Sequence, residues 1–250
     1  MAPTIHFVRH AQGFHNLSHA AEQLHDPDLT PLGLQQCANL SAQFPHHTDI
    51  TKLIASPMRR TMYTCLHAFG TTNPSLLPIV ALPVFQEISL QPCDIGSPPA
   101  KVAAEFADKA DYSRVEASWT EKGTTSPYEP TLEKLLARGK QGRLALREIA
   151  GSGDDHIVVV THGGILHFLT DDWHGVDEDQ ATGWKNCEYR SYQFIDSTGK
   201  DEEASLRETA ESFRRRQPTM TQLTETEQRE LRAHGIQKMG PYLHLINVKN

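Results

Sequence analysis

The sequence lacks a long hydrophobic run and an excess of basic residues. No apolar stretch approaches the roughly 18 to 20 residues that a membrane-spanning helix needs, and the mean hydropathy of the 250 residues is -0.48. Acidic side chains outnumber basic ones by 31 to 24, which gives a formal net charge of -7. Proteins that neutralise nucleic-acid phosphates need the opposite balance. The composition therefore predicts a cytoplasmic chain that binds neither membrane nor nucleic acid.

Cysteine is also scarce. The chain has no CxxC pair and no HExxH motif, and its four cysteines are far apart: Cys37, Cys65, Cys93 and Cys187. Isolated thiols are typical of a reducing compartment, and most zinc sites in proteins need closely spaced ligands. These absences predict free thiols and give no support for a structural or catalytic metal.

Histidine, by contrast, is abundant, with 14 residues. Four of them resemble a loose metal cluster: His46, His47, His167 and His174. Their spacing gives no ligand geometry, so we expect surface or supporting positions for them, no metal and no cofactor.

Short β-prone runs alternate with helical stretches along most of the chain. The runs lie near 4–8, 52–55, 79–82, 156–160 and 187–195, and helical periodicity is strongest over 31–44, 58–69 and 132–149. Continuous apolar strands that alternate with helices are typical of a mostly parallel sheet covered on both faces. The pattern predicts an α/β fold with three layers, α/β/α.

The length favours one domain over residues 1–250. Residues 91–130 are rich in proline and lack a long periodic run, and we interpret them as an insertion that forms a lid over the core. Its aromatic residues hint at a substrate with apolar bulk: Phe106, Tyr112, Trp119 and Tyr128. Residues 197–235 are dense in Glu, Arg, Gln and Thr and predict a charged peripheral segment.

Charged and polar residues stand where the predicted strands end. Arg9 and His10 follow the first strand, Arg60 lies after the second, and His162 follows the strand at 156–160. The carboxyl ends of strands in such sheets form ligand sites. Forked guanidinium donors match the oxygens of a phosphate monoester, and neighbouring arginines keep an imidazole neutral and nucleophilic. If the fold brings these residues together, they form a phosphoryl-transfer site, in which Glu87 is a candidate to protonate the leaving oxygen.

Five segments in order resemble the signature of the histidine phosphatase superfamily, also called phosphoglycerate mutase-like. They are FVRHAQGFHN, DPDLTPLG, ASPMRRT, FQEI and VVVTHGG. The resemblance covers roughly residues 4–195, with a poor match over 91–130. The runs QPCDIG and NCEYRS, together with Phe14 and His15, are typical of a eukaryotic, fungal or plant, branch of uncharacterised phosphatases. The resemblance implies a phosphoglycerate mutase-like fold.

The resemblance also implies residue roles. It makes His10 the nucleophile that becomes phosphohistidine, Glu87 the acid and His162 the second catalytic histidine. Contacts to the phosphate are implied for Arg9, Asn16, Arg60 and Gly163.

Two of these assignments have rivals in the sequence. Arg59 competes with Arg60, which fits better because it directly precedes Thr61. Asp94 competes with Glu87 for the role of the acid. Two departures, Ala11 in place of glycine and the run 13–15, affect the substrate side of the site.

These residues favour a metal-independent phosphomonoesterase, a hydrolase of the histidine acid phosphatase type that acts on a small phosphate ester. A phosphoglycerate mutase is the first alternative, but the mutases of this family usually have Glu-Arg-His-Tyr where this chain has Glu87-Ile88-Ser89-Leu90. A non-catalytic phosphate-binding scaffold is the second alternative, and the complete set of pocket residues argues against it.

Overall fold

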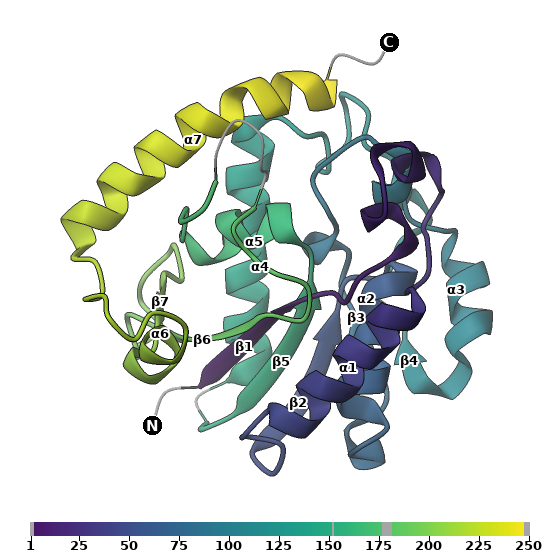
Figure 1. Cartoon of the computed structure of the whole chain (residues 1–250), viewed down its shortest axis with the longest axis horizontal. Helices are drawn as coiled ribbons and strands as arrows, with labels where there is room; N and C mark the ends of the chain where they lie inside the picture. The colour runs from purple at the N-terminus through teal and green to yellow at the C-terminus, as the bar shows by residue number, and fades with distance from the viewer. Residues whose placement is uncertain (1–2, 152, 177–181, 248–250) are drawn as a thin grey trace.

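A mixed, mostly parallel sheet forms the centre of the fold (Figure 1). The computed structural model describes residues 3–151, 153–176 and 182–247, and within them the seven strands have the order β4-β3-β2-β5-β1-β6-β7. Pairing is parallel from β4 to β1 and antiparallel from β1 through β6 to β7. The strands are β1 Thr4–Arg9, β2 Ile50–Ala55, β3 Ile79–Ala81, β4 Ala110–Asp111, β5 His156–Thr161, β6 Tyr189–Phe194 and β7 Leu206–Glu208.

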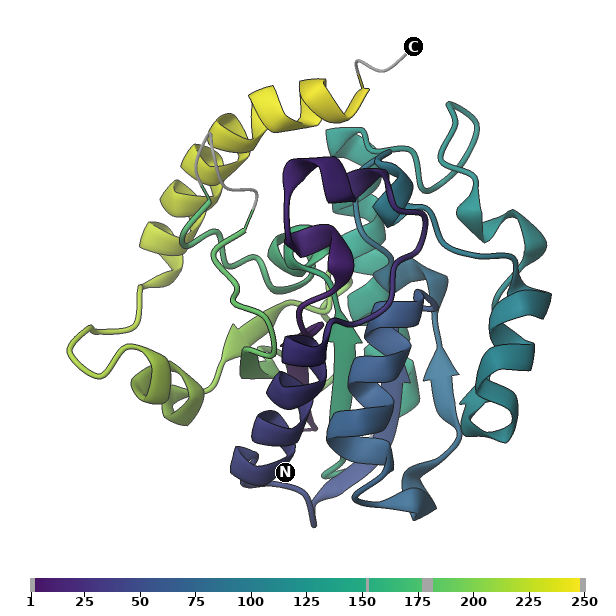
Figure 2. The same cartoon turned by 45° about the vertical axis from the view of Figure 1, so that its right-hand side comes forward.

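Helices cover both faces of this sheet. They are α1 Pro31–Gln43, α2 Arg59–Cys65, α3 Pro99–Phe106, α4 Leu132–Ala150, α5 Gly163–Thr170, α6 Ala210–Arg216 and α7 Glu225–Asn247. Side chains of β5 alternate between two buried clusters, with Ile157 and Val159 facing α4 and α5, and Val158 and Val160 facing α1 and α2. The three-layer α/β/α prediction is therefore confirmed. Figure 2 shows α1 and α2 side by side in front of the sheet.

Local sequence signals explain where the principal helices begin. The hydroxyl of Thr30 accepts a hydrogen bond from the backbone N–H of Gly33, and Pro31 occupies the first turn of α1. Thr131 caps α4 in the same way, through the N–H of Lys134. None of the helices in the described ranges is long and apolar enough to cross a membrane.

The segment 91–130 contributes α3 and β4, and two of its aromatic side chains lie in the core. Phe106 and Trp119 are buried against the α1 and α2 side of the sheet, and the indole N–H of Trp119 donates to the carbonyl of Ser97. The expectation that these two rings meet a substrate is therefore wrong, because their surface is already covered by the protein. Tyr112 and Tyr128 are half-buried.

The segment 197–235 adds β7 to the sheet edge and continues through α6 into α7. Helix α7 lies across the outside of the molecule (Figure 1), where Ile236 and Met239 join the core beside α5. Gly235 lets this helix approach Trp173, since a Cβ at Gly235 would lie 2.7 Å from the Trp173 Cβ.

The contact between α4 and α5 depends on Gly139. A Cβ at this position would lie 2.3 Å from the carbonyl oxygen of Phe168, a backbone atom that cannot rotate away. Alanine is favoured over glycine in a helix by about 1 kcal/mol, but forced overpacking typically costs about 1–3 kcal/mol. Because the clash is with a backbone atom, we expect a cost near the upper end of this range. After the propensity gain is subtracted, Gly139→Ala should lower the free energy of unfolding by about 1–2 kcal/mol, measured by urea denaturation.

The matched control is Gly153→Ala, where an added Cβ would meet nothing within 4 Å. Its stability is expected to stay within about 0.5 kcal/mol of the parent protein. Equal stability of the two variants would contradict the packing argument.

Candidate active site

The predicted residues meet at the carboxyl ends of β1, β2 and β5. His10 follows β1, and its N–H donates to the Thr161 carbonyl at 2.9 Å. Ser56 follows β2, and its N–H donates to the Val160 carbonyl at 3.0 Å. These bonds hold the three strand ends in register. The ring centroids of His10 and His162 are 5.3 Å apart, and the charge of Arg60 acts on both rings.

The environment of His10 defines which ring nitrogen is free. Its side chain is 2 % exposed, and Nδ1 lies 2.7 Å from the carbonyl oxygen of Ala11. A carbonyl only accepts hydrogen bonds, so Nδ1 carries the hydrogen and Nε2 keeps its lone pair. Burial, followed by the positive charge of Arg60, lowers the pKa of His10 well below its usual value. The imidazole is thus neutral, with the lone pair of Nε2 unengaged.

His162 is held by the loop after β2. Its Nε2 lies 2.9 Å from the hydroxyl of Ser56, and the ring is fully buried. Burial and the charge of Arg60 lower the pKa of His162 well below the usual value. Within the described residues its buried Nδ1 has no hydrogen-bond partner.

The structure separates the roles of the two adjacent arginines. Arg60 is 1 % exposed, and its Nη2 lies 2.9 Å from Asp94 Oδ1 beside the two histidines. Arg59 instead bonds Glu105 through Nε at 2.8 Å and Asp28 through Nη2 at 3.0 Å. Arg60 is therefore the arginine of the strand-end cluster, and Arg59 ties α2 to α3.

The two candidate acids have different environments. Asp94 is ion-paired with Arg60 and accepts a hydrogen bond from Ser89. Glu87 lies at the start of α5 and accepts hydrogen bonds from the N–H groups of Gly164 and Ile165, both at 3.1 Å. Burial and then the charge of Asp94 raise the pKa of Glu87. Such a carboxyl group holds its proton longer than an exposed one.

Gly164 makes the position of Glu87 possible. A Cβ on Gly164 would lie 2.7 Å from the Glu87 carboxylate oxygen. The absence of a side chain at Gly164 therefore leaves room for the Glu87 carboxyl group. Gly163 is the first residue of α5, and a Cβ there would lie 2.6 Å from the Thr182 side chain.

Lys122 is a site residue that the sequence does not reveal. Its buried ammonium group donates to the carbonyl oxygens of Glu87 at 2.7 Å, Ser89 at 2.9 Å and Asp94 at 2.8 Å. Burial lowers the pKa of Lys122 to about 7. One side chain from the 91–130 segment thus holds the loop that carries both carboxylates.

Two further basic residues lie near the cluster. The ring of His15 is 5.3 Å from that of His10, and burial, Arg60 and Arg9 lower the pKa of His15 to about 2. Arg138 of α4 is 2 % exposed, and its guanidinium nitrogens have no hydrogen-bond partner among the described residues. The sequence could have indicated His15, because it lies five positions after His10. It could not have indicated Arg138, because a lone arginine on a helix has no distinguishing pattern.

Arg9 and Asn16 have hydrogen-bond partners outside the group formed by His10, Arg60, Glu87 and His162. The Arg9 guanidinium donates to the Trp184 carbonyl, and its charge helps to lower the pKa of His10, after burial, Arg60 and His15. Asn16 is exposed, and its Oδ1 accepts a hydrogen bond from the Gly13 N–H at 3.1 Å. The Asn16 oxygen therefore stabilises the turn that follows His10.

The four histidines singled out as a loose cluster do not gather. His167 is buried, with its ring nitrogens on the Asp172 carbonyl and the Thr182 hydroxyl. His47 bonds the Ser41 carbonyl. His46 instead lies with Asp49 and His156, a group that the sequence spacing did not indicate.

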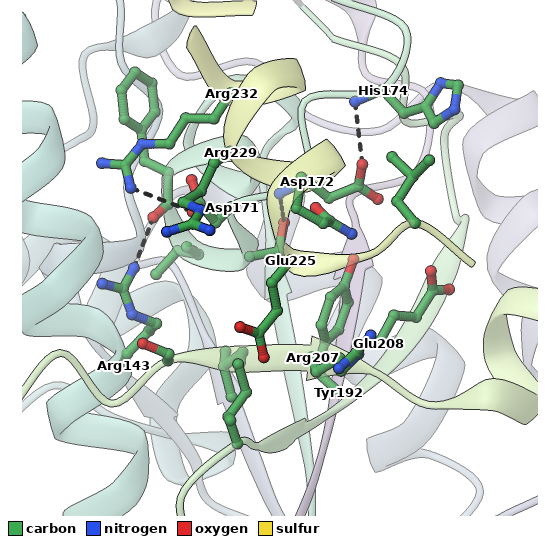
Figure 3. A pocket seen from close by; sticks show the side chains of 18 of the residues that line it. Arg143, Asp171, Asp172, His174, Tyr192, Arg207, Glu208, Glu225, Arg229 and Arg232 are labelled. Carbon is green, nitrogen blue, oxygen red and sulfur yellow. Dashed lines mark hydrogen bonds and ion pairs between the residues drawn. The ribbon is translucent and has the colours of Figure 1, made fainter. Parts of the chain in front are cut away.

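A separate cavity of about 500 Å³ lies between α4, α5, β7 and α7. Figure 3 shows charged side chains from these elements around it, among them the pair Arg232 and Asp171, 3.3 Å apart. Arg216 and Glu208 form another pair in its wall, at 2.7 Å. None of the strand-end residues lines this cavity, so it is distinct from the candidate active site.

The chain belongs to the histidine phosphatase superfamily (branch 1), whose sequence profile matches residues 5–206. Members of this superfamily are phosphatases or mutases, and the protein is therefore an enzyme that hydrolyses or transfers phosphoryl groups. A phosphoglycerate mutase-like protein of Arabidopsis thaliana is 30% identical over 236 residues, which cover 77% of this chain and 84% of the relative.

Two solved structures share the fold. The ecdysone phosphate phosphatase of Bombix mori, in complex with tungstate, aligns with a TM-score of 0.56 and 13% identity over 89% of this chain and 95% of its own. A mutant phosphoserine phosphatase of Entamoeba histolytica, in complex with phosphoserine, gives 0.51 and 15% over 83% and 95%.

The buried neutral histidines predict a stability that falls with acidification. In the folded state the pKa of six histidines is lowered: His6, His10, His15, His67, His162 and His167. Below about pH 6.5 the unfolded chain binds protons at these groups while the folded chain does not. Each such histidine then lowers the free energy of unfolding by about 1.4 kcal/mol per pH unit. We expect a steep loss of stability between about pH 6.5 and 5, measured by urea unfolding.

His15→Gln removes one of these groups, so its free energy of unfolding is expected to fall less steeply as the pH is lowered. The slope should be smaller by the contribution of one proton, about 1.4 kcal/mol per pH unit. The exposed His25→Gln is the control and should keep the parental slope. A His15→Gln slope equal to that of the parent would contradict the assignment of a neutral buried ring.

Proposed function

We propose that this enzyme is a metal-independent phosphomonoesterase of the histidine acid phosphatase type, acting on a small phosphate ester in the cytoplasm through a phosphohistidine at His10. The observation that carries the proposal is the hydrogen bond from His10 Nδ1 to the Ala11 carbonyl, which leaves the Nε2 lone pair beside Arg60 and His162. A neutral imidazole with one nitrogen held and the other free is suited to attack phosphorus.

In the first step the Nε2–P bond forms as the ester P–O bond breaks. Positive charge develops on the His10 ring, and the Ala11 carbonyl stabilises it through the Nδ1 hydrogen bond. Arg9, Arg60 and His162 hold the phosphoryl oxygens, whose charge is spread in the transition state. The free Nδ1 of His162 donates to one of them when the Ser56 hydroxyl donates to Nε2. Asn16 and Gly163 complete the predicted contacts.

Glu87 supplies the proton to the leaving oxygen, so the product leaves as an alcohol. Its raised pKa favours the protonated form that this step requires. In the second step the Glu87 carboxylate takes a proton from water, the water oxygen attacks phosphorus, and the N–P bond breaks to release phosphate and neutral His10. No residue in this sequence of steps requires a metal ion.

The intermediate can be trapped. With a ³²P-labelled phosphomonoester in EDTA, we expect a phosphoprotein that is labile to acid and stable to alkali, and turnover that persists. His10→Ala is expected to lose the label and at least about 10³-fold in kcat, because nucleophile and leaving-group steps act as a unit. His47→Ala is the control, since His47 lies away from the strand ends.

Loss of turnover in EDTA, or an unchanged rate in His10→Ala, would overturn the proposed chemistry. Interconversion of phosphoglycerates in the presence of a bisphosphoglycerate primer, faster than release of phosphate, would identify the enzyme as a mutase instead.

Substrates with different leaving groups can show whether Glu87 or Asp94 is the acid. An alkyl phosphate needs a proton on its leaving oxygen, whereas p-nitrophenolate leaves readily without one. Glu87→Gln is expected to slow the alkyl substrate by about 10²–10⁴-fold and p-nitrophenyl phosphate far less. Asp94→Asn should slow both substrates to a similar extent, because it releases Arg60. The reverse pattern would make Asp94 the acid.

A further inference from the structure

A second group of histidines lies at the amino ends of β2 and β5, whereas His10 lies at the carboxyl ends of the strands. His156 is the first residue of β5, and His46 and Asp49 belong to the loop before β2. The two strands are parallel neighbours, with Ile50 paired to His156, so this loop meets the start of β5. One ligand-type atom from each of His46, Asp49 and His156 lies within 4.8 Å of the others.

The separation between His46 and Asp49 suits a tetrahedral metal ion. Nδ1 of His46 is 3.4 Å from Oδ2 of Asp49, which is long for a charged hydrogen bond. Nitrogen and oxygen ligands at about 2.0–2.1 Å from zinc in a tetrahedral arrangement lie about 3.3 Å apart. The ligand atom of the third residue, His156, lies within 4.8 Å of the other two, and an inward movement of this ring would complete three corners of such a site.

A chain of hydrogen bonds prepares His156. Nδ1 of His156 lies 3.0 Å from Nε2 of His6, and Nδ1 of His6 lies 2.9 Å from the Ser191 hydroxyl. When each Nδ1 donates along this chain, the lone pair of His156 Nε2 remains free. Metal-binding histidines are usually oriented in this way by a partner on the other ring nitrogen.

Space for an ion and its water lies next to these rings. His6, His46 and His156 line a cavity of about 220 Å³ together with side chains from β6 and α6. Arg215 adds a positive charge to the wall of this cavity. The negative charges of Glu211 on the same helix and of Asp49 in the loop counterbalance it. Asp49 is exposed, so an ion can enter from solvent.

We propose that His46, Asp49 and His156 bind one divalent ion of the zinc class, with water as the fourth ligand. The site is separate from the chemistry at His10, because His6 precedes His10 by four residues of an extended strand, about 13 Å. A bound ion would tie the loop before β2 to the start of β5. We therefore expect it to stabilise the fold and to leave catalysis unchanged.

The test uses the full chain, stripped with EDTA and dialysed against Zn²⁺. We expect about one ion per chain by elemental analysis, a higher unfolding temperature with zinc, and visible absorption bands typical of tetrahedral cobalt when Co²⁺ replaces it. Asp49→Asn and His46→Ala are each expected to weaken binding at least about 10-fold. Both residues are in a surface loop, so the variants test the site without disturbing the core.

His47→Ala is the matched control, because it removes a histidine one position away that has no atom in the cluster. It should bind zinc like the parent protein. Absence of bound zinc, equal affinity in Asp49→Asn and the parent, or binding that is lost only in His10→Ala would overturn the proposed site. Hydrolysis of phosphate esters in EDTA is measured in parallel, so failure of the metal site and failure of the proposed function give different results.

Discussion

The parallel pairing of β1, β5 and β2 is the constraint on which the candidate active site depends. His10, Ser56 and His162 directly follow these three strands and meet in one cluster. Two backbone hydrogen bonds continue the pairing past the strands, from His10 to Thr161 and from Ser56 to Val160. Because side chains alternate along a strand, a shift by one residue would turn His10 or His162 away from its partner. Buried residues on both faces of β5 oppose such a shift.

Within this frame, electrostatics decides the protonation states. Buried imidazoles close to Arg60 stay neutral. Burial and then the charge of Asp94 raise the pKa of Glu87, although hydrogen bonds from backbone N–H groups oppose this shift. The overall charge of -7 does not describe this region. The excess of positive charge around His10 is local, and a dianionic phosphate would compensate it.

Much of the fold and the strand-end cluster follows from sequence patterns, for physical reasons. Apolar runs that alternate with capped helices define the layers, and the carboxyl ends of parallel strands necessarily meet. Lys122 and Arg138 escape such reasoning because their positions depend on tertiary packing of the 91–130 segment and of α4. The same holds for Phe106 and Trp119, whose apolar rings suit a core as well as a substrate. His46 and His156 are 110 positions apart, and only the pairing of β2 with β5 brings them together.

The three hydrogen bonds of Lys122 have a consequence for any exchange of the segment in which it lies. This lysine belongs to the segment 91–130, which matches the family pattern poorly. In this enzyme the same segment fixes the backbone of the loop that bears Glu87 and Asp94. Under the proposed function, exchanging this segment would therefore also remove the support of the loop that carries the proton donor. A chimera with a foreign insertion would need a new contact to hold that loop in place.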